Sequence, residues 1–202
     1  MSGLQRINGF HVFSRVVHAD DRGMFSEIVR NETITETLGR SFVVKQVSVS
    51  HSQSGVLRGL HLTDVPPGQA KLLSCLSGRF IEVVVDLRIG SPTFGRHEAT
   101  NMSADEPVSI FIAEGLAHGY LALEDNSSML YLHSSVYAPR HDHEIDALDP
   151  DLAIAWPLDS RQLRRSAKDT AAMTVREAVA AGILPRYENC ADAGAPPTPR
   201  TA

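Results

Sequence analysis

Two short stretches place side chains that handle protons among glycine and aliphatic residues. GVLRGLHL (55–62) contains Arg58 and His61, and AKLLSCL (70–76) contains Lys71. Imidazole titrates near neutral pH and often serves as a general base, whereas a lysine that faces a barrel interior needs an anion or a developing negative charge beside it. The pattern favours proton abstraction. A hydrogen-bonded core histidine and a solvent-facing lysine are the alternatives at this stage.

Two further stretches could complete such a site. EGLAHGY (114–120) places His118 between small residues, where a backbone can approach a ligand closely. YLHSSVY (131–137) places Tyr131 and Tyr137 on the same face of an uninterrupted strand. A phenol stays protonated at neutral pH and can donate a proton. A histidine in a turn and tyrosines in the core remain the alternatives.

Strand geometry constrains GVLRGLHL. Side chains alternate between the two faces of a strand, so Arg58 and His61 point to opposite sides of a regular one. A bulge or twist at Gly59 would change this. We therefore expect separate jobs for the two side chains, with the glycines leaving room for a ligand between them.

The nine histidines also raise the question of a metal site. HDH (141–143) offers two imidazoles around a carboxylate, but metal-binding barrels of the cupin kind carry HxH followed by a glutamate. Here Thr63 stands two residues after His61, and no glutamate follows before Lys71, whose charge would repel a cation. The sequence therefore predicts no catalytic metal.

The elements that must position these residues are short strands. From residue 42 to about 135, runs rich in β-branched and aromatic residues alternate with breakers such as DVPPGQ, which is typical of an antiparallel sandwich or barrel. GFHVFSRVV and MFSEIVR predict an N-terminal hairpin about ADDRG, and ETITETLGR predicts a short helix. The clearest strands are 42–50, 70–78, 80–88, 108–115 and 128–137.

The pattern of residue types changes after Trp156 and Pro157. SAKDTAAMTVREAVAAGILP (166–185) has apolar residues near helical spacing and ends with a glycine and a proline, which predicts a small helical segment packed on the β core. We expect a single domain over residues 1–187 and a disordered tail, rich in alanine and proline, over 188–202.

Composition argues against several classes of protein. The 202 residues are 43% hydrophobic and 21% charged, and the formal charge of −5 has no long single-sign block, which argues against bulk nucleic-acid binding. No apolar stretch is long enough to span a membrane, and the N-terminus does not resemble a signal peptide. We therefore expect a cytoplasmic protein that binds neither nucleic acid nor membrane.

The residues together resemble a known family, the cofactor-independent nucleotide-sugar epimerases of the dTDP-4-dehydrorhamnose 3,5-epimerase type. The motifs that match follow the family's order over residues 10–170. They are DDRGMFSE (20–27), GVLRGLH (55–61), QAK (69–71), VVDLRIGSPTFG (84–95), AEGLAHGY (113–120), LYLHSSVYAP (130–139) and LDPDLAIAWP (148–157). PPGQAK, with KQVSVSHS upstream, resembles the antibiotic deoxysugar branch, some members of which invert C3 alone.

The resemblance implies a mainly β fold, a cupin-like antiparallel barrel of jelly-roll type with a small C-terminal helical segment. It implies a homodimer whose N-terminal strands reach across to the partner. The implied substrate is a dTDP-linked 4-keto-6-deoxyhexose, which is inverted at C3 by deprotonation and reprotonation through an enolate. Inversion at both C3 and C5 stays an alternative. No metal, nicotinamide or other cofactor is implied.

The resemblance also assigns catalytic roles. His61 matches the base, and Asp169 matches the carboxylate that orients it. Lys71 matches the cation beside the enolate oxygen, and Tyr131 matches the acid on the opposite face.

Binding residues follow in the same way. Arg58 and Arg22 match contacts to the diphosphate, which suits guanidinium groups, and Tyr137 matches a ring that stacks on thymine. The other implied substrate contacts are Phe25, Glu27, Gln46, Ser48, His118, Asp142 and Lys168. Family members often carry Asn in place of Ser48 and Glu in place of Asp142, so the nucleotide side departs from the family pattern.

Two functions of other classes stay open on the sequence. A metal-dependent cupin oxygenase or isomerase would hold metal in stoichiometric amount. A non-catalytic sugar-binding module would keep its ligand affinity in the variant His61→Ala. Fold alone does not separate these functions, because related barrels carry unrelated chemistries.

Overall fold

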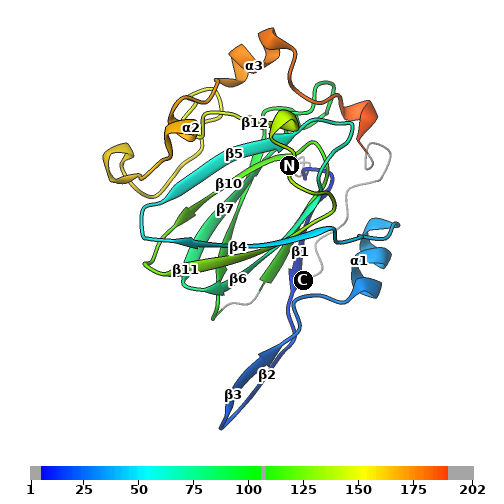
Figure 1. Ribbon diagram of the computed structural model, residues 1–202, viewed down its shortest axis with the longest axis vertical. Helices are drawn as coiled ribbons and strands as arrows, with labels where there is room; N and C mark the ends of the chain where they lie inside the picture. Colours follow the sequence, from blue (N-terminus) through cyan, green and yellow to red (C-terminus); the bar gives the residue numbers. More distant parts are fainter. Residues whose placement is uncertain (1–5, 106–107, 191–202) are drawn as a thin grey trace, which may run out of the picture.

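Two antiparallel sheets face one another in the computed structural model, which describes residues 6–105 and 108–190 (Figure 1). The strand order is β1-β9-β6-β11-β4 in the first sheet and β12-β5-β10-β7-β8 in the second. The remaining two strands, β2 and β3, form a hairpin that projects from the body (Figure 1). The mainly β, cupin-like jelly roll predicted from the sequence is confirmed.

The described chain contains twelve strands and a few short helices. The first sheet consists of β1 (Phe10–Ser14), β4 (Gln46–Ser52), β6 (Lys71–Ser77), β9 (Val108–Ile112) and β11 (Ser127–His133). The second consists of β5 (Leu57–Thr63), β7 (Arg79–Val85), β8 (His97–Ser103), β10 (Ala117–Ala122) and β12 (Asp142–Glu144). The hairpin is β2 (Val17–Asp20) with β3 (Gly23–Ser26). The helices are α1 (Asn31–Leu38), η1 (Pro139–His141), η2 (Ser160–Gln162), α2 (Ala167–Thr170), α3 (Val175–Ala181) and η3 (Tyr187–Asn189).

Apolar side chains from both sheets form one core between them. Leu72 and Phe111 of the first sheet belong to the same buried cluster as Phe80 and Tyr120 of the second. A second buried cluster joins β5, β7 and β10 to the C-terminal segment, with Val175 as one contributor. The predicted helical segment therefore packs on the β core, as expected.

The helix boundaries follow from their caps. Gly39 closes α1 in the left-handed conformation, with φ 66°, and Gly182 closes α3 in the same way, with φ 67°. Thr174 and Glu177 form a capping box at the start of α3. Both helix ends predicted from glycine are confirmed. None of the described helices is long and apolar enough to cross a membrane.

The N-terminal hairpin differs from the one predicted. The run GFHVFSRVV is divided, because β1 pairs with β9 of the first sheet and β2 alone pairs with β3. The edge of β9 offers backbone partners that local sequence cannot reveal. The turn within ADDRG is confirmed, since Asp20 pairs with Gly23.

The strand predicted over 128–137 is too long, and β10 and β8 were not predicted. β10 is a fully buried strand, although EGLAHGY allowed a turn around His118. β11 ends at His133, so Tyr137 lies beyond the strand rather than on a shared face with Tyr131. β8 has no run of apolar residues that would have marked it as a strand, and its pairing with β7 accounts for its conformation.

Most of the predicted tail, residues 191–202, lies outside the described residues. Its first residues belong to the folded chain, because η3 covers Tyr187–Asn189 and Cys190 is buried.

Glycines allow β5 and β10 to approach closely. The register between the two strands shifts from His61 opposite His118 to Arg58 opposite Tyr120, which marks a bulge in β5. Gly59 has φ 109°, and a Cβ there would lie 2.7 Å from the Cα of Gly119. The strands can keep this register only with glycine at the contact.

The variant Gly59→Ala tests this constraint. We expect it to lower the free energy of unfolding by roughly 2–4 kcal/mol, from backbone strain together with overpacking. Gly90→Ala is the matched control, because Gly90 also has a positive φ, 87°, but nothing lies within 4 Å of an added Cβ. Urea unfolding of both variants measures the difference. Equal losses of stability would contradict the close approach.

Candidate active site

His61 and Asp169 form a hydrogen-bonded pair between β5 and α2. His61 Nε2 lies 2.9 Å from Asp169 Oδ1, and the N-cap residue Ser166 donates its hydroxyl to Asp169 Oδ2 at 2.7 Å. Burial alone would raise the pKa of Asp169, but the hydrogen bonds from His61 and Ser166 outweigh it and lower the pKa to about 2. An ionised carboxylate can only accept, so the facing ring nitrogen carries a proton. The other ring nitrogen of neutral His61 keeps the lone pair that a base needs.

The bulge at Gly59 brings Arg58 and His61 to the same space. Regular alternation would separate the two side chains, yet both line the same cavity. The backbone N–H of Gly59 also donates to Asp169 Oδ1 at 3.3 Å. The bend therefore aims the histidine and helps to hold the carboxylate that orients it.

A chain of three buried polar groups connects β6, β10 and β7. Lys71 Nζ lies 2.9 Å from His118 Nε2, and His118 Nδ1 lies 2.7 Å from Glu82 Oε1. An ammonium only donates, so Nε2 of His118 accepts and Nδ1 carries the proton that faces Glu82. Burial, with Lys71 nearby, lowers the pKa of His118 well below its ordinary value, so the imidazole is neutral.

Burial also shifts the two outer groups of this chain. It lowers the pKa of Lys71 to about 8, against the attraction of Asp142 and Glu82. It raises the pKa of Glu82 well above its ordinary value, against the attraction of Lys71. Lys71 is therefore an ammonium at neutral pH, but it holds its proton less firmly than a lysine in water. A negative charge that develops beside it would stabilise the charged form.

Tyr131 lies on β11 of the first sheet, whereas His61 lies on β5 of the second. Its hydroxyl lies 3.4 Å from Ser50 Oγ, and its ring stacks on His133 with centroids 5.8 Å apart. Burial raises the pKa of the Tyr131 phenol well above its ordinary value. The phenol is therefore protonated at neutral pH and can serve as an acid.

One cavity brings these groups together. Its volume is about 170 Å³, and its walls include His61 and His118 from the second sheet and Lys71 and Tyr131 from the first. It adjoins an outer cleft of about 520 Å³. The residues that line both are Arg58, His61, Tyr137 and Asp142, and the outer cleft adds Lys168 and Asp169.

The mouth of the cavity is held by polar contacts. Gln46 Oε1 accepts the backbone N–H of Tyr137 at 2.8 Å, and Gln46 Nε2 donates to Ser48 Oγ at 3.1 Å. The side chain of Tyr137 is free to meet a ligand, since the residue is 51% exposed. Gln46 and Ser48, two of the predicted substrate contacts, do not line the cavity or the cleft. Gln46 instead holds the backbone of Tyr137, and Ser48 holds Gln46.

Lys168 joins α2 to β12 at the outer cleft. Its Nζ lies 3.6 Å from Asp142 Oδ2 and also contacts Glu144 Oε1. The hydrogen bond to Glu144 raises the pKa of Lys168, so the group is a cation at neutral pH. The contact keeps a positive charge at the wall of the cleft.

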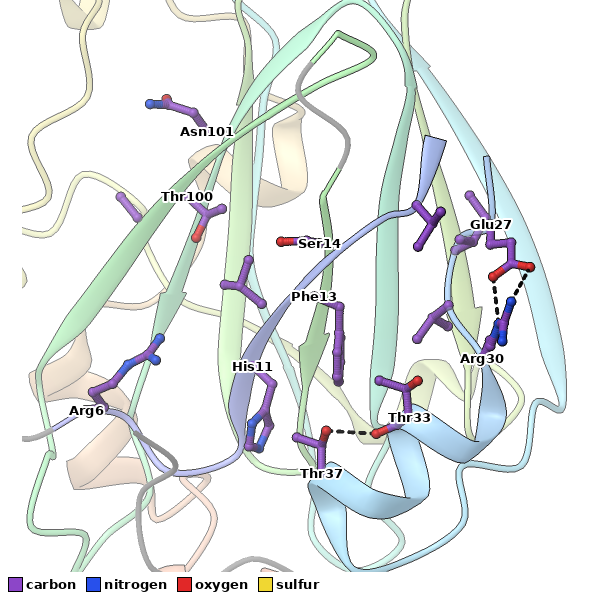
Figure 2. A pocket seen from close by; sticks show the side chains of 15 residues that line it. Arg6, His11, Phe13, Ser14, Glu27, Arg30, Thr33, Thr37, Thr100 and Asn101 are labelled. Atoms are coloured by element: carbon purple, nitrogen blue, oxygen red, sulfur yellow. Dashed lines mark hydrogen bonds and ion pairs between the residues drawn. The ribbon is translucent and has the colours of Figure 1, made fainter. Parts of the chain in front are cut away.

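Besides Gln46 and Ser48, three more predicted residues do not line the cavity or the cleft. Arg22 occupies the turn of the β2–β3 hairpin and pairs with Asp20, and Phe25 on β3 is 67% exposed. Glu27 pairs with Arg30 at 2.8 Å and lines a separate hollow of about 750 Å³ beside β1 and α1 (Figure 2). Within one chain, then, these residues do not join the other predicted contacts.

The hollow of Figure 2 does not have the character of a catalytic site. His11 and Phe13 of β1 project into it, Glu27 is bonded to Arg30, and Thr37 donates to the backbone of Thr33. The one carboxylate that lines it is thus already paired with a guanidinium group. The side chains that could move protons gather instead in the smaller cavity between the sheets.

Sequence reasoning missed several residues of the site. Glu82 is the single carboxylate in the strand RFIEVVV, the same kind of anomaly that pointed to Lys71, and could have been found in the same way. Tyr120 and His133 also line the cavity, and Ser50 contacts Tyr131. These three carry no local signal, because tyrosine, histidine and serine are ordinary in strands.

The histidines of HDH (141–143) raised the question of a metal site. Within residues 6–105 and 108–190, no three His, Cys, Asp or Glu side chains are placed to hold a metal ion. His141 and His143 instead both contact Asp64, at 3.1 and 2.7 Å.

The geometry suits proton transfer at carbon. A histidine that is hydrogen-bonded to a carboxylate stands on one wall, and a phenol and an ammonium stand on the other. Such a site can remove a proton from one face of a carbon acid and return one to the opposite face.

Residues 5–177 match the family model for dTDP-4-dehydrorhamnose 3,5-epimerase. The chain belongs to this epimerase family. The matched segment contains every residue for which the sequence predicted a catalytic or binding role. The predicted family is confirmed, and with it the class of the enzyme, an isomerase.

Relatives of this epimerase include enzymes named for one inversion and for two. A Streptomyces dTDP-4-dehydro-6-deoxyglucose 3-epimerase is 45% identical over 173 residues, which cover 86% of this chain and 88% of that one. A Mycobacterium tuberculosis dTDP-4-dehydrorhamnose 3,5-epimerase is 46% identical over 173 residues, covering 85% and 86%. Overall identity therefore does not separate the two activities.

A solved structure supports the same assignment. The epimerase resembles ChmJ, a 3′-monoepimerase from Streptomyces bikiniensis in complex with dTDP-quinovose, with a TM-score of 0.85 and 43% identity. The superposition covers 90% of this chain and 91% of that one.

The buried ammonium of Lys71 gives a pH-dependent prediction. Its pKa in the folded protein, about 8, lies below the ordinary value of 10.5, so between these values the unfolded chain binds more protons and stability rises with pH. Relative to Lys71→Met, the wild type should gain roughly 3 kcal/mol across this interval. Urea unfolding at several pH values measures it.

The exposed Lys45 supplies the control, because Lys45→Met corrects for general alkaline effects. A constant difference between wild type and Lys71→Met from pH 8 to 10.5 would show that the ammonium is not buried as described.

Proposed function

We propose that this epimerase inverts C3 of a dTDP-4-keto-6-deoxyhexose by deprotonation and reprotonation through an enolate. The observation that carries the proposal is the placement of His61 and Tyr131 on opposite walls of one cavity. The C4 ketone acidifies the neighbouring C–H bond, and inversion needs a base on one face and an acid on the other.

The proposed reaction moves two protons. His61 takes the C3 proton, and Asp169 stabilises the imidazolium that results. The electron pair of the C–H bond moves to the C4 oxygen, where Lys71 donates a hydrogen bond. An oxyanion donor of this kind contributes roughly 10²–10³-fold to the rate. Tyr131 then protonates C3 from the opposite face, and solvent restores the protonation states of both residues.

The outer cleft suits the nucleotide. Arg58 and Lys168 supply positive charge along its wall, and the exposed ring of Tyr137 offers a stacking surface at its mouth. Guanidinium and ammonium groups bind diphosphate oxygens, and a phenol ring can stack on a base. The sugar would then occupy the inner cavity.

We also propose a homodimer in which the β2–β3 hairpin reaches the partner's site. The hairpin exposes Val17, Met24 and Phe25, and β4, at the free edge of the first sheet, exposes Val47 and Val49. Apolar side chains on a projecting hairpin and on an edge strand favour pairing with another chain. Arg22 and Phe25 would thereby reach a nucleotide bound by the partner. A cytoplasmic location, a single domain and the lack of nucleic-acid binding stay predictions.

Solvent deuterium tests the proposed reaction. With dTDP-4-keto-6-deoxyglucose in deuterium oxide, proton NMR should show label at C3 of the inverted product and reports C5 at the same time. His61→Asn should reduce label entry by roughly 10²–10⁴-fold, since it removes the base. Absence of label at both carbons with the wild type would sink the proposal. Activity abolished by a chelator would instead favour the metal-dependent alternative.

Mixed dimers test whether Arg22 acts across the interface. Arg22→Ala and His61→Asn chains with different tags are coexpressed, and the heterodimer is isolated by both tags. If Arg22 serves the partner's site, one of the two sites is intact and the heterodimer has about half of wild-type activity, far above either variant homodimer. If Arg22 serves its own chain, each site carries one defect and no activity returns. The second outcome would refute the exchanged hairpin.

A further inference from the structure

Four hydroxyl groups form a chain that ends at Tyr131. Tyr120 donates its hydroxyl to Ser50 Oγ at 2.9 Å, and Ser52 Oγ lies 3.1 Å from the same tyrosine oxygen. Ser50 Oγ in turn lies 3.4 Å from the hydroxyl of Tyr131. The chain therefore runs from Ser52 through Tyr120 and Ser50 to the phenol at the cavity.

We propose that Ser50 and Tyr120 are positioning residues that hold the Tyr131 phenol against the face of the sugar opposite His61. This inference rests on the proposed function. It adds to that function two residues that aim the acid without themselves serving as the base or the acid.

The inner end of the chain is rigid. Tyr120 is 2% exposed, and its ring meets Phe80 edge-on with centroids 5.0 Å apart. Ser52 is 3% exposed. Tyr120 belongs to the second sheet, whereas Ser50 and Tyr131 belong to the first, so the hydroxyl chain connects the two sheets. The position of the phenol is thus tied to both walls of the cavity.

The direction of the hydrogen bonds gives the chain a chemical consequence. Because Tyr120 donates to Ser50, the oxygen of Ser50 is an acceptor there and its own hydrogen can point to the Tyr131 oxygen. The hydrogen of Tyr131 is then left for the carbon. When it has been transferred, the phenolate retains a hydrogen bond from Ser50, which stabilises the charge that forms.

His61 does not depend on this chain. It is held by Asp169 on the other wall, so proton removal continues when the phenol is misplaced. An enolate that is not protonated by Tyr131 is reprotonated by His61 on the original face. In deuterium oxide the N–H of the His61 imidazolium exchanges with solvent, so a return after this exchange places label in substrate that keeps its configuration.

The experiment measures the ratio of C3-deuterated, uninverted substrate to inverted product. Ser50→Ala should raise this ratio roughly tenfold or more, because the hydrogen bond to the Tyr131 phenolate is lost. Tyr120→Phe should raise the ratio in the same direction, because Ser50 loses the hydroxyl that orients it. Tyr131→Phe is the reference in which the acid itself is absent. Ser50→Thr keeps a hydroxyl and should restore the ratio toward that of the wild type.

Ser128→Ala is the matched control. Ser128 lies on β11 like Tyr131, and its hydroxyl bonds His51 of β4 at 2.8 Å, outside the chain behind the phenol. This variant removes one hydroxyl contact between the same two strands and should leave the ratio unchanged.

Equal reductions of label entry and inversion in Ser50→Ala, with the ratio at its wild-type value, would overturn the inference while the proposed function stands. A wild-type enzyme that shows neither label entry nor inversion would overturn the proposed function itself. Ser50→Ala decides the matter alone if Tyr120→Phe fails to fold.

Discussion

The close approach of Gly59 and Gly119 is the constraint on which the site depends. With no side chains between β5 and β10 at this point, β5 can bulge and turn both Arg58 and His61 toward one cavity. The same bend lets the Gly59 N–H reach Asp169, which comes from a helix more than a hundred residues further along the chain. A Cβ at Gly59 would meet backbone, which has no rotamer by which to move away.

The second constraint is the cost of burying charge between two apolar sheets. Successive hydrogen bonds among Lys71, His118 and Glu82 reduce this cost, with a neutral imidazole between the lysine ammonium and the glutamate side chain. An unpaired ammonium at this depth would be far more costly. The arrangement leaves Lys71 poorly solvated beside an open cavity. A new negative charge on a ligand is attracted to Lys71 more strongly there than it would be in water.

The local pattern of residue types predicted those parts of the fold that depend on neighbouring residues. Strand-forming runs, the turn at ADDRG and the glycine caps of α1 and α3 depend on backbone preferences of nearby residues, and these predictions hold. Pairing partners depend on distant strands. That is why β1 joined β9 rather than β3, and why the polar strand β8 and the buried strand β10 were not recognised. The residues behind the acid escaped notice for the same reason, since Ser50 and Tyr120 acquire their role only by meeting.

The sequence by itself determined the family, the barrel and the chemical types at the site, because these follow from ordered motifs and from polar residues in apolar runs. Only the tertiary structure decided which side chains meet. It brought His61 to Asp169 and linked Lys71 to Glu82 through His118. It left Arg22, Phe25 and Glu27 away from the cavity of their own chain. The physical reason is that hydrogen bonds and pKa shifts depend on distance and burial, which arise when two sheets pack and which no single segment specifies.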